Sequence, residues 1–240
     1  MTEFYAAVGR EVVIFGSGPS LRSQDVARID ASAALLVNGA VTLMPRLQGA
    51  FAIAIEDERF VWRHFGNMLQ QLPRDPVFLL SPSVIRAILS HDASWCDGRR
   101  IVLIENLYKP FDGARRRFSD ASVQKLVTGT GENCFSRDPG VGIIPAGTVA
   151  FSAMQFAIAA RPECIGLAGI DLSNADGPRF YENGAQAASG IVGAEQRILN
   201  HFEYAAEQAG KLGVTIEVYS RVSALLTRGL PYSDRLVQVR

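Results

Sequence analysis

The stretch VVIFGSGPSL, residues 12–21, joins a short apolar run to a turn that contains two glycines, two serines and a proline. The apolar run Val12–Phe15 predicts a buried strand, and Leu21 is expected to begin a helix. Gly16 and Gly18 have no Cβ, so the backbone between strand and helix can approach a ligand closely. The free N–H groups at a helix start favour an anion. The stretch therefore predicts either a phosphate or ribose site or a turn that binds nothing.

The turn supplies five candidate ligand-binding residues. Its proline suits the first turn of a helix, where the missing N–H costs no hydrogen bond, and the two serine hydroxyls add donors. We expect the ligand to be held by Gly16, Ser17, Gly18, Pro19 and Ser20. On this interpretation, Gly18→Val removes nucleotide binding and leaves the fold largely intact.

Similar apolar runs recur along the chain, with helical patterns between them. Because the runs are continuous rather than alternating, they are typical of strands that are covered on both faces. The predicted strands span residues 11–16, 33–38, 49–56, 76–81, 100–106, 164–171 and 214–220, and the predicted helices span residues 21–30, 59–71, 82–91, 147–160 and 192–211. This alternation predicts an α/β fold, with one Rossmann-like domain over residues 1–240 and a mainly parallel sheet of about seven strands flanked by helices.

The composition indicates a globular protein without a strong net charge. The chain has 240 residues, 48% of them hydrophobic, and its 24 basic residues balance 24 acidic ones. Nothing in this balance favours nucleic acid as a partner. The three cysteines are not closely spaced, which predicts neither a disulfide framework nor a zinc site. The sequence shows no signal peptide and no apolar run long enough for a membrane span, so we expect a reduced, cytoplasmic protein.

Residues 106–146 form the least regular part of the sequence and are rich in Gly, Pro, Arg and Asp. A long irregular segment in a compact domain is often a lid or a binding loop, so we expect part of it to fold over the ligand. The segment contains the basic run Arg115–Arg117. This run is either a solvated loop or a contact for acidic lipid heads or an anionic acceptor, which would give a peripheral membrane contact.

The first turn departs from the dinucleotide-binding fingerprint in two ways. Leu21 stands where the third glycine of the G-x-G-x-x-G pattern is expected, and Asn38 rather than an acid ends the second predicted strand. An amide both donates and accepts hydrogen bonds, so Asn38 can bind a ribose or a base. These departures argue against NAD and leave a nucleotide site in place.

A second helix start can also face an anion. The predicted helix 147–160 is apolar nearly all round, which indicates that it is buried against the sheet. The positive end of its dipole lies at a Gly-containing turn. The candidate binding residues at this turn are Ala146, Gly147 and Thr148.

Polar side chains follow several of the predicted strands. Ligands of open parallel sheets lie at the carboxyl ends of the strands, so these side chains are expected to converge on a nucleotide diphosphate, or on a monophosphate joined to a sugar. They are Asn38, Glu56, Asp57 and Asp171. A purely structural role, capping the loop that follows, is the alternative for Asp171. The acidic run at residues 56–58 is explained as a charged strand end, and we expect no bound metal.

Residues 12–40 and 135–174 together resemble the bacterial sialyltransferase-like glycosyltransferases, and also the related motility-associated glycosyltransferases and the hydroxymethylpterin pyrophosphokinase-like domain. The resemblance rests on GSGPSL, on Asn38 at a strand end, and on AGTVAFSAMQFAI followed by CIGLAGIDL. It implies a GT-A-like variant of the nucleotide-binding α/β fold. It also implies a CMP-sugar as the donor substrate, with no cofactor and no essential metal.

The resemblance also implies roles for individual residues. Ser17, Asn38, Glu56 and Asp171 correspond to donor-contacting positions, and Pro145–Gly147 correspond to a segment that contacts the nucleotide.

This chain departs further from the family at the positions that carry out the family's chemistry than at the positions that contact the donor. Of the two tyrosines that hold the leaving phosphate in the family, the first corresponds to Ser173 and the second only approximately to Tyr181. Gly193 stands where the general-base histidine is expected without a gap. Within this chain we take His201, on the predicted helix 192–211, and Tyr181 as the candidate catalytic residues.

The sequence thus predicts a metal-independent glycosyltransferase that moves an acidic sugar, of the sialic acid or Kdo type, from a CMP-sugar to a surface glycan or lipid-linked lipopolysaccharide acceptor. It would act in the cytoplasm and could contact the inner face of the membrane. A pyrophosphokinase that uses ATP and magnesium and a non-catalytic nucleotide-sugar-binding module are the alternatives. Whether the chain forms a homo-oligomer is left open.

Overall fold

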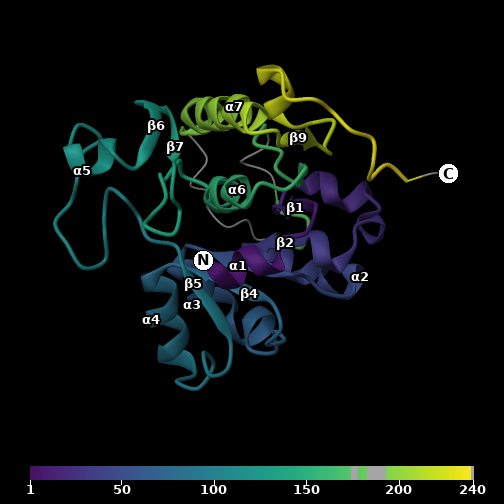
Figure 1. Ribbon diagram of the computed structural model, residues 1–240. Coiled ribbons are helices and arrows are strands. Elements are labelled where there is room, and N and C mark those ends of the chain that lie inside the picture. Colours follow the sequence, from purple (N-terminus) through teal and green to yellow (C-terminus); the bar gives the residue numbers. More distant parts are fainter. Residues whose placement is uncertain (174–177, 183–192, 239–240) are drawn as a thin grey trace.

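The computed structural model describes residues 1–173, 178–182 and 193–238 (Figure 1). Its centre is a seven-stranded sheet in the order β5-β4-β3-β2-β1-β8-β9, and every neighbouring pair is parallel. The strands are β1 Glu11–Phe15, β2 Ala34–Val37, β3 Ala52–Ile55, β4 Val77–Leu80, β5 Arg100–Leu103, β8 Cys164–Ala168 and β9 Thr215–Val218. The predicted Rossmann-like α/β fold is confirmed, and each predicted strand contains one of these seven.

The apolar runs are continuous because both faces of the sheet are covered. Along β1, Val12 and Ile14 belong to one hydrophobic core, whereas Val13 and Phe15 belong to the other. Side chains alternate between the two faces of a strand, so a strand with helices on both sides must be apolar at every position.

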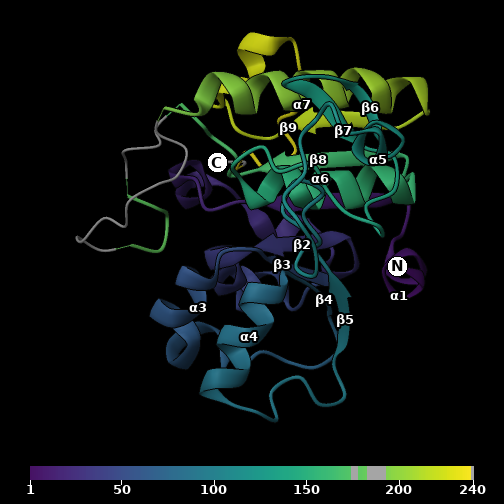
Figure 2. The same ribbon diagram turned by 90° about the vertical axis from the view of Figure 1, so that its left-hand side faces the viewer.

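Two layers of helices bury these faces (Figures 1 and 2). The first core also includes residues of α1 Thr2–Ala7, α6 Val149–Ala160 and α7 Glu195–Lys211. The second core includes residues of α2 Met44–Leu47, α3 Glu58–His64 and α4 Pro82–His91. No helix within the described ranges is both long and apolar enough to cross a membrane.

The predicted helices are confirmed at 82–91 and 147–160, and α7 accounts for the helix predicted at 192–211, of which residue 192 lies outside the described residues. The helix predicted at 59–71 is α3 followed by a π-helical turn, Phe65–Leu69. The helix predicted at 21–30 is wrong. Short 3₁₀ turns occur at Pro19–Ser23, Val26–Arg28, Ala31–Ala33, Asn38–Leu43 and Ala224–Arg228.

Residues 106–146 are more ordered than their composition predicts. They contain α5 Ala121–Gln124 and an antiparallel hairpin of β6 Val127–Thr130 and β7 Asn133–Ser136. A small core of their own forms beneath the hairpin, from Leu107, Val123, Val127, Cys134 and Ile144. The expectation of an irregular segment is therefore wrong for 121–136, and closure of the segment over a ligand stays a prediction.

Candidate functional site

The strand order reverses beside β1, which pairs with β2 on one side and β8 on the other. Phe15, the last residue of β1, lies opposite Leu36 and Ala168, so the three strands end level with one another. In open α/β sheets the crevice at such a reversal is the usual ligand site. Here the crevice between β1 and β8 is filled by contacts between the two segments that follow these strands.

An internal carboxylate occupies the first turn. Asp171 Oδ2 accepts the backbone N–H of Ser20 at 3.0 Å, and Asp171 Oδ1 accepts the Ser20 hydroxyl at 2.7 Å. The N–H of Gly18 donates to the carbonyl of Gly169 at 2.7 Å, and the N–H of Gly16 donates to that of Ala168 at 2.8 Å. Of the donors that the sequence assigned to a phosphate, those of Gly16, Gly18 and Ser20 are therefore satisfied within the protein.

The glycines of the turn have a packing role. A Cβ on Gly16 would lie 2.4 Å from the Gly169 carbonyl oxygen, and a Cβ on Gly18 would lie 2.4 Å from Asp171 Oδ2. The helix after the turn is a five-residue 3₁₀ helix, Pro19–Ser23, without the aligned dipole of an α-helix. Asp171 thus joins β8 to the first turn. Within the described structure the contacts of this turn are internal, and none of Gly16, Gly18, Pro19, Ser20 and Asp171 lines the pocket described below, so ligand binding by these residues stays a prediction.

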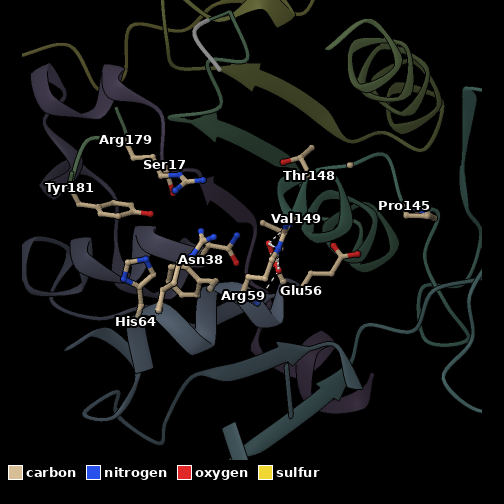
Figure 3. Close-up of a pocket in the computed structure, with 14 residues that line it drawn as sticks. Ser17, Asn38, Glu56, Arg59, His64, Pro145, Thr148, Val149, Arg179 and Tyr181 are labelled. Atoms are coloured by element: carbon tan, nitrogen blue, oxygen red, sulfur yellow. Dashed lines mark hydrogen bonds and ion pairs between the residues drawn. The ribbon is translucent and has the colours of Figure 1, made fainter. Parts of the chain in front are cut away.

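A pocket of about 390 Å³ opens beside this contact, at the carboxyl ends of β1, β2 and β3 and under the N-terminus of α6 (Figure 3). Its size lies within the roughly 300–1,000 Å³ of small-molecule sites. It is lined by Ser17, Asn38, Glu56, Asp57, Arg59, Phe60, Arg63, His64, Pro145, Gly147, Thr148, Val149, Arg179 and Tyr181.

Three polar atoms in this pocket are shielded from solvent and lack a hydrogen-bond partner within the described part of the chain. They are Asn38 Oδ1, His64 Nδ1 and Tyr181 Oη. Only five such side-chain atoms occur among the described residues, so this pocket holds most of them. Buried polar groups without partners are costly, and their convergence indicates that a polar ligand completes the site.

A larger cavity, of about 730 Å³, lies at the other end of α6, near Ile158 and Arg161. None of the five unpaired atoms lines it. It also lies away from the carboxyl ends of the strands, because α6 ends just before β8 begins. We therefore take the smaller pocket as the functional site.

Asn38 is held in a strained backbone conformation at the end of β2. Its φ of +47° lies in the left-handed region, which asparagine tolerates better than most residues other than glycine. Strain of this kind at a pocket-lining residue is typical of functional sites. In Figure 3 the Asn38 amide lies in the middle of the pocket, between the Tyr181–His64 side and the Glu56–Arg59 side.

The position of Tyr181 is fixed by hydrogen bonds to the backbone of the two residues before it, Arg179 and Phe180. The N–H of Phe180 donates to the carbonyl of Ser17 at 3.2 Å, and the Arg22 guanidinium donates to the carbonyl of Arg179 at 3.0 Å. The Tyr181 ring lies against Gly39, where a Cβ would come within 2.1–2.4 Å of ring atoms. The side chain therefore occupies a slot that only a glycine leaves open.

The side of the pocket around Tyr181 carries the guanidinium groups of Arg63 and Arg179. Arg179 forms an ion pair with Glu182 at 3.0 Å. Burial, followed by the charges of Arg179 and Arg63, lowers the pKa of His64, so His64 is neutral at pH 7. Burial raises the pKa of Tyr181, and the charge of Arg179 partly opposes this. A neutral imidazole, a phenol and a guanidinium together suit an anionic oxygen.

The opposite side of the pocket carries two carboxyl groups. Burial raises the pKa of Glu56, although the Ser152 hydroxyl donates a hydrogen bond of 2.6 Å to Glu56 Oε2. Asp57 caps α3 and pairs with Arg59 at 2.8 Å. Burial acts to raise the pKa of Asp57, but its hydrogen bonds to Arg59 outweigh that effect and lower the pKa. Of the two carboxyl groups, Glu56 is thus the one whose pKa is raised and Asp57 the one whose pKa is lowered.

Searches of protein-family models and of curated proteins found no match to this chain. Among residues 1–173, 178–182 and 193–238, no group of three or more His, Cys, Asp or Glu side chains is arranged to hold a metal ion.

The structure brings together seven of the fifteen residues predicted as substrate-binding or catalytic. Those that line the pocket are Ser17, Asn38, Glu56, Asp57, Gly147, Thr148 and Tyr181. Ala146 is fully buried behind them, and the Ser173 hydroxyl donates to the carbonyl of Val222 at 2.6 Å. Neither Ala146 nor Ser173 lines the pocket.

His201 does not reach the pocket. Its ring is buried against Phe151, and Nδ1 lies 2.9 Å from the carbonyl oxygen of Cys134. The structure therefore does not bring His201 to the pocket, and its assignment as a catalytic residue stays a prediction.

The side chains that α3 contributes were not among the predicted site residues. They are Arg59, Phe60, Arg63 and His64. The position of α3 directly after the acidic end of β3 could have indicated these residues. A helix that begins at the carboxyl end of a parallel strand starts beside the ligand crevice.

Glu56→Gln is expected to stabilise the protein at neutral pH and to change stability little near about pH 4. The raised pKa means that ionising Glu56 costs more in the folded protein than in the unfolded chain. Its favourable contribution is therefore complete below the unfolded pKa of about 4.3 and is lost as the pH rises through the folded pKa. Urea denaturation of both proteins between about pH 4 and pH 8 measures the difference.

Glu58→Gln is the matched control for this experiment, because Glu58 pairs with Arg86 at the surface. A stability difference between wild type and Glu56→Gln that stays constant with pH would show that Glu56 is not desolvated.

Proposed function

We propose that this chain is a glycosyltransferase and that the pocket binds a CMP-sugar donor. The observation that carries the proposal is the convergence of three unpaired buried polar atoms, on Asn38, His64 and Tyr181, beside the Arg179 guanidinium. A nucleotide joined to a sugar through a phosphate presents both the hydroxyls and the anionic oxygens that such a set can bind.

The two sides of the pocket favour different parts of that donor. Tyr181, His64 and Arg179 suit the phosphate, and the N-terminus of α6 at Thr148 adds the positive end of a helix dipole. The Asn38 amide suits ribose or cytosine, because it offers donors and an acceptor. An acidic sugar, of the sialic acid or Kdo type, would add a second negative charge that the arginines of the pocket attract.

Sugar transfer breaks the bond between the anomeric carbon and a phosphate oxygen, and negative charge develops on that oxygen. A hydroxyl and a guanidinium directed at this charge stabilise the transition state more than the ground state. In the proposed reaction, Tyr181 and Arg179 perform this role for the departing CMP. A glycan or lipid-linked acceptor of the bacterial surface, met at the inner face of the membrane, remains the proposed partner.

One observation favours a second candidate, a nucleotide-sugar-binding module without catalysis. His201, the histidine expected as general base, is buried away from the pocket. The two candidates differ in one measurable property, because a binding module holds CMP and leaves the donor intact.

Nucleotide binding is tested by thermal shift with CMP, UMP, GMP and ATP, each with and without magnesium. We expect CMP to raise the melting temperature without magnesium. Stabilisation by ATP that requires magnesium would favour a pyrophosphokinase instead. If no nucleotide stabilises the protein, the proposed function is wrong.

Asn38→Gly is expected to weaken CMP binding by roughly 1–3 kcal/mol, which is about 5- to 150-fold in Kd. Glycine removes the amide but accepts the positive φ of +47°, so the backbone is not strained further. Gln48→Gly is the control, because Gln48 is an exposed residue with a similar φ of +58° outside the pocket. Calorimetry with CMP measures both variants, and equal affinity in Asn38→Gly and wild type would exclude the Asn38 contact.

A further inference from the structure

A second, smaller cavity shares one residue with the donor pocket. It has a volume of about 210 Å³ and lies where β4 and β5 end, next to the strand ends that form the donor pocket. Glu56 lines both cavities. This volume falls below the roughly 300–1,000 Å³ of sites for larger ligands and suits a single sugar ring rather than a nucleotide.

We infer that this second cavity receives the acceptor, and that Glu56 is the general base that takes the proton of the attacking acceptor hydroxyl. The inference rests on the proposed function, because it assigns the acceptor side of the same reaction. The acceptor class is a sugar that carries a phosphate or carboxylate.

The loop that forms the outer wall of the cavity is held by its own side chains. Glu105 Oε1 accepts the N–H groups of Asn106 at 2.9 Å and Phe111 at 3.0 Å. Asn106 Oδ1 accepts the N–H groups of Tyr108 at 2.8 Å and Lys109 at 3.1 Å. These bonds use one carboxylate oxygen of Glu105 and the amide oxygen of Asn106 to fix the loop, and both side chains line the cavity.

Lys109 and Phe111 are the side chains presented at the cavity. Phe111 is 70% exposed, and its aromatic face suits the apolar face of a sugar ring. Lys109 is exposed beside it, and its ammonium favours an anionic group. This pairing is the reason for assigning an anionic sugar to the cavity.

The inner wall of the cavity fixes Glu56. The Ser81 hydroxyl donates to the Glu56 carbonyl at 2.9 Å and lies 3.0 Å from the Ser83 hydroxyl. On the other side, the Ser152 hydroxyl on α6 holds one carboxylate oxygen at 2.6 Å. Figure 3 shows the Glu56 side chain directed toward α6, at the margin of the donor pocket. The remaining carboxylate oxygen can serve a hydroxyl that lies between the two cavities.

In the proposed step, the acceptor oxygen forms a bond to the anomeric carbon of the donor, and its proton passes to the Glu56 carboxylate. The bond between the anomeric carbon and the phosphate oxygen breaks, and its electron pair leaves with CMP. Burial raises the pKa of Glu56, which makes its carboxylate a stronger base than an exposed one.

The first arm of the test follows cleavage of CMP-N-acetylneuraminic acid and CMP-Kdo with water as acceptor. We expect Glu56→Gln to lower kcat about 10²- to 10⁴-fold while the donor KM changes little, because the amide keeps the Ser152 hydrogen bond. Glu58→Gln, at the start of α3 and paired with Arg86, is the control and should behave as wild type. If wild type binds CMP and cleaves a donor but Glu56→Gln cleaves it equally fast, the base assignment is wrong and the proposed function stands.

The second arm measures acceptor binding by saturation-transfer NMR, with glucose 6-phosphate and glucose as probes and with CMP at saturation. We expect Lys109→Ala to weaken binding of glucose 6-phosphate about tenfold and to leave that of glucose unchanged. Phe111→Ala should weaken both probes. Lys125→Ala is the control, as an exposed cation of the same segment outside both cavities.

Two results of the second arm would overturn the cavity assignment. One is loss of glucose 6-phosphate binding on addition of CMP, which would place the probe in the donor pocket. The other is equal weakening by Lys125→Ala and Lys109→Ala, which would indicate a general basic surface. If the wild-type protein neither binds CMP nor cleaves a donor, the proposed function is wrong, and this inference is wrong as well.

Discussion

Gly18→Val is expected to destabilise the fold by at least about 3 kcal/mol. A Cβ at this position would lie 2.4 Å from Asp171 Oδ2 and 2.7 Å from the Gly169 carbonyl oxygen. One of these neighbours is backbone, which cannot move without disturbing the pairing of β1 with β8. The larger side chain would also break the hydrogen bonds between Ser20 and Asp171. The expectation that this variant spares the fold is therefore reversed.

Urea denaturation at pH 7 measures the effect, with Gly9→Val as the control. Gly9 lies just before β1, and a Cβ added to it would have no neighbouring atom within 4 Å. We expect the control to remain within about 0.5 kcal/mol of wild type, as is usual for surface substitutions. If the two variants unfold at the same urea concentration, the turn is looser than the structure indicates.

Tyr181→Phe is expected to lower kcat for donor cleavage about 10²- to 10³-fold, the usual cost of removing one hydrogen-bond donor aimed at developing charge. Its buried hydroxyl has no well-formed hydrogen bond among the described residues, although Arg179 and Ser17 lie near enough to oppose the rise in its pKa that burial causes, so the main loss is expected in the interaction with the ligand. The free energy of unfolding should change little. Steady-state kinetics with a CMP-sugar and urea denaturation test these two expectations.

Gly39→Ala provides an independent test, because its Cβ would displace the Tyr181 ring. We expect it to lower kcat as well, and to have little further effect when combined with Tyr181→Phe. Tyr5→Phe, on α1 and outside the pocket, is the control. Full activity in Tyr181→Phe would remove the tyrosine from the proposed chemistry and leave Arg179 as the group that faces the phosphate.

The sequence predicted the sheet well because burial on both faces leaves an unmistakable pattern. Runs such as Val12–Phe15 and Ala52–Ile55 are apolar at every position, and the two cores divide them by alternate residues. The hairpin of β6 and β7 left no such pattern, because β6 is only partly buried and contains Gly129. The 3₁₀ turn at Pro19–Ser23 has the same start signals as an α-helix, so composition alone could not separate them.

Half of the site was also predictable, since parallel strands end at one edge. Asn38, Glu56 and Tyr181 line one pocket, the first two because they follow neighbouring strands. The partner of Asp171 was not predictable, because the sequence does not indicate that an acid 151 positions away satisfies Ser20. An internal carboxylate and a bound phosphate require the same donors, and only the folded chain distinguishes them.

Any anion that approaches the first turn from solution must compete with the Asp171 carboxylate for the hydrogen-bond donors of Ser20. The folded chain holds this carboxylate against its donors at 2.7 and 3.0 Å, which gives it a high effective concentration. Even short flexible tethers reach effective concentrations of about millimolar, and a group fixed by two strands exceeds them. A dissolved phosphate at ordinary cellular levels is therefore a poor competitor at this turn, and the phosphate of the proposed donor would have to be held by the neighbouring pocket.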